Sequence, residues 1–99
     1  MSENAIRVIA RFAAKPEHVG VVRRILTALI EPTRKEAGCI TYDLMQNKQD
    51  PTDFTFVEEW RSRDALDRHL STEHIGNCVS HIGEYVETDP DIRIYKVLG

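Results

Sequence analysis

The chain has 99 residues, 41% of them hydrophobic and 29% charged, and a formal net charge of −3 at neutral pH. This length predicts one domain over residues 1–99, with a modest core that association with a second copy would extend. Lys and Arg form no cluster, so the sequence predicts no nucleic-acid partner. No apolar run approaches the roughly 20 residues of a membrane span, so no membrane partner is expected either.

The first residues and the cysteines indicate a compartment. Met1 to Asn4 are mostly polar and lead straight into a strand-like segment, which is not the pattern of a secretory signal peptide. Cys39 and Cys78 are isolated from one another, and such a lone pair favours reduced thiols over a disulfide. We therefore expect a cytoplasmic protein.

The N-terminal third predicts a strand followed by a long helix. Residues 6–14 alternate with the two-residue period of a strand. Lys15-Pro16-Glu17 then opens the helix, because proline fits a first helical turn, and an apolar stripe continues it through residue 30. Pro32 is expected to kink or end this helix, and Gly38 to stop its last turn.

The rest of the chain predicts a hairpin, two helices and a last strand. Ile40, Tyr42 and Leu44 are expected on one face of the second strand, and Ser62 and Thr72 are expected N-caps. The expected bounds are 39–48 and 54–60 for the hairpin strands, 63–70 and 73–83 for the helices, and 92–98 for the last strand. This βαββαβ order, with the last helix divided, is that of the ferredoxin-like α+β fold, an antiparallel sheet with helices on one face.

Apolar residues on both faces of the sheet predict a homodimer. In the first strand Val8 and Ile9 fall on opposite faces, and in the third strand Phe56 and Val57 do the same. A solvated face should be polar. We therefore expect a second copy of the chain to cover the open face in a symmetric dimer.

Standard cofactor and nucleophile motifs are missing from the sequence, including Gly-rich phosphate loops, the Rossmann fingerprint, Gly-x-Ser-x-Gly and Cys-x-x-Cys. The informative stretch runs from Glu58-Glu59-Trp60 through Ala65-Leu66-Asp67-Arg68-His69 to Leu70-Ser71-Thr72-Glu73-His74. Together with Lys15-Pro16, Glu36-Ala37-Gly38-Cys39 before Tyr42, and Asp50-Pro51, it resembles the antibiotic-biosynthesis monooxygenase (ABM) family, including its quinol-monooxygenase-like members. Glu73 departs from the pattern, since members often have proline there.

The resemblance implies a dimeric α+β barrel with a pocket between sheet and helices in each subunit. It also implies oxidation of phenols or quinols by molecular oxygen without flavin, haem or metal, so no cofactor is expected. Haem-degrading relatives on this fold use an Asn-Trp-His set. By alignment, Ile9 replaces that asparagine and His69 occupies the position of the tryptophan, which argues against haem.

His69 and His74 are candidate catalytic residues. His69 ends a predicted helix and titrates near neutrality, which suits a general base, although a helix C-terminus also stabilises a merely structural cationic histidine. His74 begins the next helix, where the dipole favours a neutral imidazole that can accept a proton or simply pack.

Glu58 is the third candidate catalytic residue. It shares a strand face with Phe56 and Trp60, and a carboxylate buried there needs a partner, such as Arg7, Arg11 or a histidine. Structural pairing of this kind is the alternative to a role in the site.

Tyr42, Trp60 and Phe56 are the candidate substrate-binding residues, although aromatic side chains at strand spacing also serve as plain core. His74, Cys78 and His81 share one helical face and offer zinc ligands. Three ligands from consecutive turns of one short helix rarely converge on an ion, so no metal is predicted.

The sequence therefore predicts a cofactor-independent monooxygenase that oxidises a small quinol, phenol or polyketide-like aromatic with molecular oxygen. Two alternatives stay open, because fold does not determine function. One is an isomerase or lyase of a small carbonyl metabolite that uses the same proton-transfer groups. The other is a non-catalytic dimeric protein that binds a small ligand or serves in stress responses.

Overall fold

The structure is a computed structural model that describes residues 5–99; the first four residues, on which the expectation about the N-terminus falls, lie outside the described part. The elements in chain order are β1 (Ile6–Ala13), the 3-10 helix η1 (Pro16–His18), α1 (Val19–Thr27), α2 (Ile30–Arg34), β2 (Cys39–Gln46), β3 (Asp53–Trp60), α3 (Arg63–Leu70), α4 (Glu73–Ile82), the 3-10 helix η2 (Gly83–Tyr85) and β4 (Asp91–Tyr95). Every expected element is present, but the first long helix is divided.

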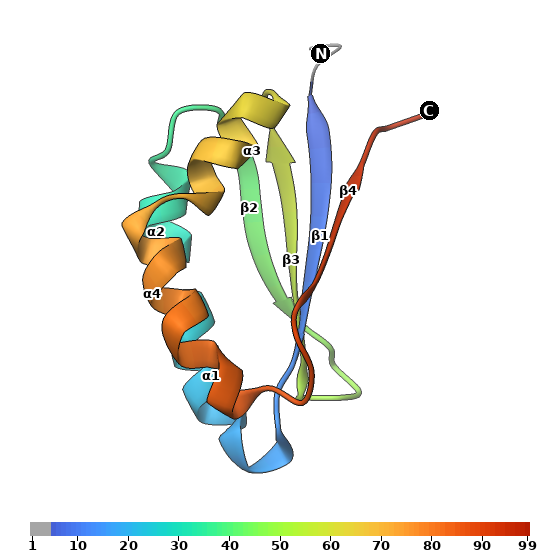
Figure 1. Cartoon of the computed structure of the whole chain (residues 1–99). Coiled ribbons are helices and arrows are strands. Elements are labelled where there is room, and N and C mark those ends of the chain that lie inside the picture. The colour runs from blue at the N-terminus through green and yellow to red at the C-terminus, as the bar shows by residue number, and fades with distance from the viewer. Residues whose placement is uncertain (1–4) are drawn as a thin grey trace.

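The four strands form one antiparallel sheet in the order β2-β3-β1-β4. Figure 1 shows helices α1 to α4 on one face of this sheet, with β4 at the edge away from the helices. This arrangement is the ferredoxin-like α+β fold, so the expected fold class is confirmed. Among residues 5–99, no helix combines the length and the apolar character needed to cross a membrane.

The core lies between the sheet and the helices. The strand residues that face it are almost fully buried and alternate with more exposed ones, as the two-residue period requires. They are Val8, Ala10 and Phe12 on β1, Tyr42 on β2, and Phe54, Phe56, Glu58 and Trp60 on β3.

The opposite face of the sheet carries Arg7, Ile9 and Arg11, the alternate residues of β1. Arg7 lies 3.6 Å from the carboxylate of Glu59, and Arg11 lies 3.3 Å from that of Asp53. The sequence period sorts β1 into two faces correctly. It could not show which face meets the helices, because both contain apolar residues.

The first long helix breaks at Ala28 and Leu29, between α1 and α2. The ring of a proline clashes with the carbonyl four residues earlier, which here is that of Ala28. Pro32 itself lies in the first turn of α2, where its missing N–H costs no hydrogen bond. The predicted effect of Pro32 is therefore confirmed, and the break falls one turn before the proline.

A bulge changes which residues of β2 are buried. The register of β2 against β3 shifts between Cys39 and Thr41. Cys39 packs against the core, whereas Ile40 is 45% exposed. The expectation that Ile40 shares a buried face with Tyr42 is wrong, because one extra residue in a strand moves the next side chain to the other face.

Side-chain caps begin α3 and α4 as expected. The hydroxyl of Ser62 accepts a hydrogen bond from the backbone N–H of Ala65 at 3.1 Å, and that of Thr72 accepts one from Ile75 at 3.4 Å. Each cap satisfies one of the N–H groups that a helix start leaves unpaired. Both caps fix where the helices that carry the candidate histidines begin.

Gly38 lets α3 approach the segment between α2 and β2. Its φ is +90°, a left-handed conformation that side chains other than glycine rarely adopt. A Cβ atom at this position would lie 2.5 Å from the Cβ of Ala65 on α3. The close contact brings α3 next to Glu36, two residues before the glycine.

Candidate active site

A cavity of about 300 Å³ lies between the buried face of the sheet and helices α3 and α4. Its lining is mostly aliphatic and aromatic, and the titratable groups in it are Tyr42, Glu58, His69, Cys78 and Asp89. The apolar part of the lining comprises Val8, Ala10, Phe12, Leu29, Phe56, Leu66, Leu70, Ile75, Val79, Ile82, Val86, Pro90 and Ile92. The pocket expected between sheet and helices is therefore present.

His69 is buried at the end of α3 and lines this cavity. Its ring packs on that of Trp60, with centroids 4.5 Å apart, and meets the ring of Tyr42 at 5.6 Å. Burial lowers the pKa of His69, while the nearby Glu36 carboxylate acts in the opposite direction. The ring is therefore held in one orientation and is neutral near pH 7.

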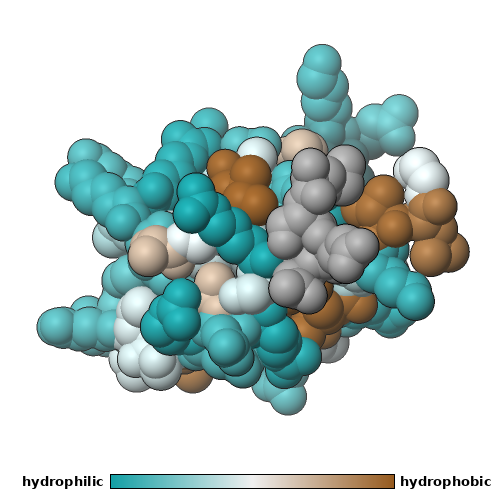
Figure 2. All heavy atoms as spheres, turned by 90° about the horizontal axis from the view of Figure 1, so that it is seen from above, coloured by the Kyte–Doolittle hydropathy of each residue, from teal (hydrophilic) through white to brown (hydrophobic). Residues whose placement is uncertain are grey.

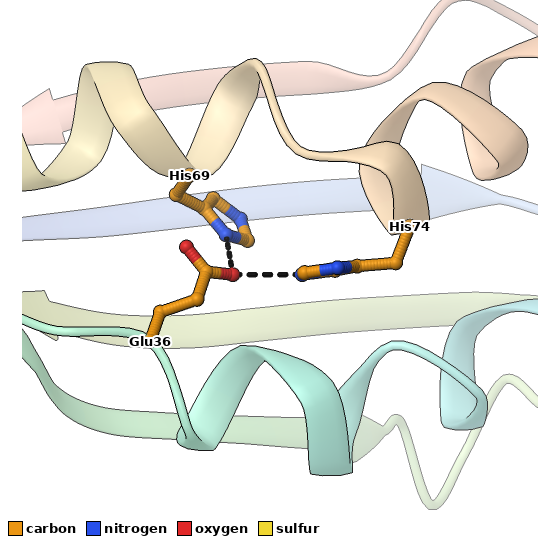
Figure 3. Close-up of side chains that lie close together, drawn as sticks. All are labelled: Glu36, His69 and His74. Atoms are coloured by element: carbon orange, nitrogen blue, oxygen red, sulfur yellow. Dashed lines mark hydrogen bonds and ion pairs between the residues drawn. The ribbon is translucent and has the colours of Figure 1, made fainter.

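Glu36 joins the two candidate histidines, as Figure 3 shows. One carboxylate oxygen, Oε2, lies 2.8 Å from Nδ1 of His69 and 2.7 Å from Nε2 of His74. A carboxylate only accepts hydrogen bonds, so each of these ring nitrogens carries the proton. The proton of neutral His69 is thus on Nδ1, and its Nε2 has a free lone pair.

Glu36 is the site residue that sequence reasoning missed. It lies in the segment after α2, 33 residues before His69, and no local pattern connects the two. The one available signal was its place at the head of the Glu36-Ala37-Gly38-Cys39 stretch that matches the family. Glu36 and His69 come close to one another because the tight turn at Gly38 brings α3 next to Glu36.

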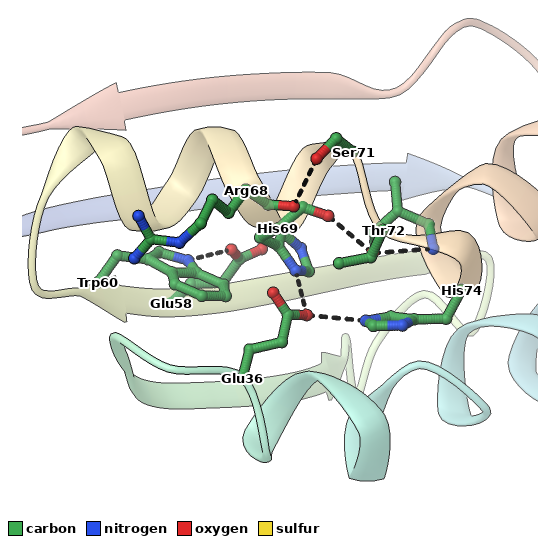
Figure 4. Close-up of polar contacts among 9 residues, drawn as sticks. Glu36, Glu58, Trp60, Arg68, His69, Ser71, Thr72 and His74 are labelled. Carbon is green, nitrogen blue, oxygen red and sulfur yellow. Dashed lines mark hydrogen bonds and ion pairs between the residues drawn. The ribbon is translucent and has the colours of Figure 1, made fainter.

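Glu58 forms a buried pair with Trp60, drawn in Figure 4. The indole Nε1–H of Trp60 donates to Oε1 of Glu58 at 2.8 Å. Burial raises the pKa of Glu58 to about 7, the Trp60 hydrogen bond opposes this, and the charge of Glu36 adds to it. The expectation that Arg7, Arg11 or a histidine partners Glu58 is wrong. Both arginines lie on the opposite face of the sheet, and His69 bonds to Glu36 instead.

The candidate substrate-binding residues lie at different depths. Tyr42 and Phe56 line the cavity with their rings stacked 4.6 Å apart, whereas Trp60 lies behind His69 and outside the lining. Burial, reinforced by the charge of Glu58, raises the pKa of Tyr42, so its hydroxyl stays protonated. Tyr42 is therefore a hydrogen-bond donor at neutral pH.

A second cavity, of about 330 Å³, lies on the other side of α4. Its lining consists of Ile25, Ala28, Leu29, His74, Asn77, Cys78 and His81. Leu29 and Cys78 line both cavities and separate them. Within residues 5–99, His74, Cys78 and His81 do not converge as a ligand set, because His74 turns toward Glu36.

The argument against haem needs one correction. Ile9 lies on the open face of the sheet and not in the cavity. The β1 residues that line the cavity are Val8, Ala10 and Phe12, none of which has a polar side chain. No asparagine from β1 therefore lines the cavity.

The fold and the cavity define a ferredoxin-like protein with a small-molecule pocket. The profile of the antibiotic biosynthesis monooxygenase family matches residues 5–80, and the chain belongs to this family. The resemblance noted from the motifs is thus confirmed.

Three relatives illustrate the similarity. The chain is 40% identical over 79 residues to "Putative monooxygenase Rv0793" of Mycobacterium tuberculosis, covering 80% of this chain and 77% of that protein. The solved structure of Rv0793 has a TM-score of 0.92 at 33% identity and covers 97% of both chains. A crystal structure described as an antibiotic biosynthesis monooxygenase has a TM-score of 0.89 at 36% identity, covering 95% of this chain and 99% of that one. "Uncharacterized protein sll1783" of Synechocystis is 30% identical over 96 residues, and the match spans 97% of this chain but 65% of that protein.

Proposed function

We propose that this protein is a cofactor-independent monooxygenase that oxidises a small quinol, phenol or polyketide-like aromatic with molecular oxygen. The observation that carries the proposal is the cavity, whose apolar walls surround Tyr42, Glu58 and His69. A few polar groups that converge in an apolar pocket are typical of a small-molecule site. The printed name of one relative, "Putative monooxygenase Rv0793", agrees with this function.

His69 is the proposed general base. Its Nδ1–H donates to Glu36, so Nε2 is free to accept the proton of a phenolic hydroxyl. The resulting phenolate gives up electrons to oxygen far more readily than the neutral phenol does. His74 supports this arrangement by holding the same oxygen of Glu36.

Tyr42 and Glu58 are the proposed donors to the phenolate. Tyr42 stays protonated, and Glu58, with a pKa of about 7, is substantially protonated at neutral pH. Hydrogen bonds to a developing negative charge are strongest where water is excluded, as in this cavity. Phe56 and Trp60 hold these groups in place by stacking and by hydrogen bonding.

The oxygen chemistry needs no reductant besides the substrate. In a phenol that carries an activated ring methylene, the CH₂ group becomes a carbonyl and its carbon loses four electrons. Dioxygen takes these four electrons, so that one oxygen atom enters the carbonyl and the other leaves as water. The two methylene hydrogens become the protons of that water.

The cavity also indicates which substrates are excluded. Its lining contains no Lys or Arg, and its ionisable carboxyl groups are Glu58 and Asp89. A phosphorylated sugar would meet no cation to offset its charge. A volume of about 300 Å³ is at the low end for small-molecule sites and suits roughly one or two fused rings.

Association with a second copy is part of the proposal. The open face carries the half-buried Ile9 and Val57, and Tyr95 of the edge strand β4, which pairs with Arg7 on this face, is 46% exposed. Figure 2 shows that the end of the molecule seen from above is mostly hydrophilic, with hydrophobic atoms in a few separate places. A symmetric dimer would bury the open face. Light scattering should give twice the chain mass, and a monomer at micromolar concentration would contradict this part.

We also propose that residues 1–99 form one domain that works in the cytoplasm. Cys39 and Cys78 are both free thiols, as a reducing compartment would keep them. Preparation without reductant should leave two titratable thiols per chain after unfolding, and a disulfide would contradict the assignment.

Oxygen consumption tests the proposed function. Chelator-treated protein is incubated with a panel of quinols and polycyclic phenols, and uptake is recorded for the wild type, His69→Ala and the control His81→Ala. His81 is an exposed histidine that lies outside the cavity lining, so its loss should not matter. We expect uptake by the wild type and the control, and at least about a hundredfold loss in His69→Ala.

Binding distinguishes the alternatives. Quenching of Trp60 fluorescence measures whether His69→Ala still binds the substrate, and circular dichroism whether it is folded. Undiminished oxygen uptake by folded His69→Ala would refute the role of His69 as general base. No oxygen uptake by the wild type with any substrate would refute the oxygenase function. In the second case, substrate-dependent proton exchange would indicate the isomerase or lyase, and binding alone the ligand-binding protein.

A further inference from the structure

Glu36, His69 and His74 bring three potential metal ligands together from three separate segments. The ligand atoms, one carboxylate oxygen and two imidazole nitrogens, all lie within 4.8 Å of one another. They come from the loop after α2, the end of α3 and the start of α4, and Figure 3 shows them pointing toward one another. Convergence from separate elements distinguishes this cluster from three ligands along one helix.

The spacing is close to that of a filled site. Zinc ligands lie about 2.0–2.2 Å from the ion, so tetrahedral ligands are about 3.4 Å from one another. The carboxylate oxygen is now 2.8 Å and 2.7 Å from the two nitrogens. Small rotations of Glu36 and His74, which are partly exposed, would open a position for the ion, while His69 stays fixed by its packing.

The charge around the cluster favours a cation. In the described part of the chain, the carboxylate of Glu36 pairs only with the two imidazoles. The guanidinium of Arg34, a nearby cation, is held instead by the backbone oxygen of Tyr42 and the carboxylate of Asp43. The carboxylate therefore faces two imidazole nitrogens and no Lys or Arg side chain, an arrangement that leaves its oxygens available to a cation.

We propose that Glu36, His69 and His74 form a binding site for one divalent transition-metal ion, with Zn²⁺ as the best match. Two histidines and a glutamate are a ligand set of catalytic zinc, and the fourth position takes water. His74 lines the second cavity, which gives the ion a route to the cluster that bypasses the substrate cavity.

Metal binding has a consequence for His69. The ion takes the lone pair of Nδ1, so the proton of the neutral ring moves to Nε2, the atom proposed above as the base. The ion-loaded protein then presents a donor to the cavity instead of an acceptor. Zn²⁺ is therefore an inhibitor of the oxygenase proposed above. The binding itself does not depend on that function.

Calorimetric titration with ZnCl₂ tests the site on metal-free, full-length protein, and Co²⁺ absorption in the visible range reports the ligand geometry. The variants are Glu36→Gln and His74→Asn, with His81→Asn as a matched histidine control on the same helix. We expect one ion per chain in the wild type and the control, and at least about tenfold weaker binding in both variants. Thermal unfolding should show Zn²⁺ raising the Tm of the wild type and of His81→Asn alone.

Three results would overturn the site: no Zn²⁺ binding by the wild type, unchanged affinity in folded Glu36→Gln and His74→Asn, or loss of binding in His81→Asn. None of these measurements involves substrate or oxygen. Failure here therefore leaves the oxygenase intact, and failure of the oxygen assay leaves the metal site intact.

Discussion

Replacing Glu58 by glutamine should stabilise the protein at pH 8. The pKa of this carboxyl is raised from its ordinary value of 4.5 to about 7 in the folded protein, mainly by burial. Below pH 4.5 the group is protonated in both the folded and unfolded states. Between pH 4.5 and 7 the folded state holds more protons than the unfolded state, so the free energy of unfolding decreases as pH rises. Above pH 7 the full cost of a buried charge is present.

The magnitude follows from the two pKa values. About 2.5 pH units separate 4.5 from 7, and each unit corresponds to about 1.4 kcal/mol, so the charge costs about 3 kcal/mol above pH 7. Glutamine has the same shape, and its carbonyl oxygen can still accept the hydrogen bond from Trp60. Glu58→Gln should therefore be up to about 3 kcal/mol more stable than the wild type at pH 8, and nearly equal to it at pH 4.5.

Urea unfolding followed by Trp60 fluorescence between pH 4.5 and 8 measures this effect. Glu59→Gln is the matched control, because Glu59 is the next residue of β3 and faces the other side of the sheet, beside Arg7. In Glu59→Gln, the free energy of unfolding should still decrease between pH 4.5 and 7 as it does in the wild type. The reasoning would be refuted by a Glu58→Gln variant that is less stable than the wild type at pH 8, or that keeps the same decrease.

Three further substitutions test local features. Gly38→Ala should lower the Tm, at a cost of about 1–3 kcal/mol, because its φ of +90° and the 2.5 Å approach to Ala65 leave no room for a Cβ; an unchanged melting curve would contradict the contact. Ser62→Ala should lower the free energy of unfolding by about 1 kcal/mol through loss of the α3 cap, measured in urea, and no loss would show that the cap contributes nothing. Tyr42→Phe keeps the stacking on Phe56, so it should lower kcat while Tm changes little; unchanged kcat would exclude the hydroxyl as a donor.

The sequence predicted the fold well where local signals are strong. Ser62 and Thr72 mark the starts of α3 and α4 because an N-cap acts within three residues. Pro32 correctly predicts a break in the helix. The break occurs at Ala28 because the proline ring clashes with the carbonyl of that residue, four positions earlier. Ile40 shows the limit, since a bulge depends on pairing with another strand and leaves no mark in β2 alone.

The candidate site was predicted in part, for a related reason. Tyr42, Glu58 and His69 meet in the cavity because period and motif place each of them on a buried face. Glu36 could not be found this way, since its link to His69 and His74 exists only after α2 and α3 pack together. The sequence also could not predict the hydrogen-bond partner of Glu58, because tertiary packing decides which face of the sheet meets the helices.

The wall between the two cavities has a consequence for the size of molecule that this protein can hold. Only Leu29 and Cys78 line both spaces, so truncating Leu29 would join volumes of about 300 and 330 Å³ into one elongated chamber. Leu29 lies at the break that Pro32 imposes, outside regular helix, where a change of side chain disturbs little backbone hydrogen bonding. A single substitution there is expected to let the proposed oxygenase accept extended polycyclic molecules without rebuilding the fold.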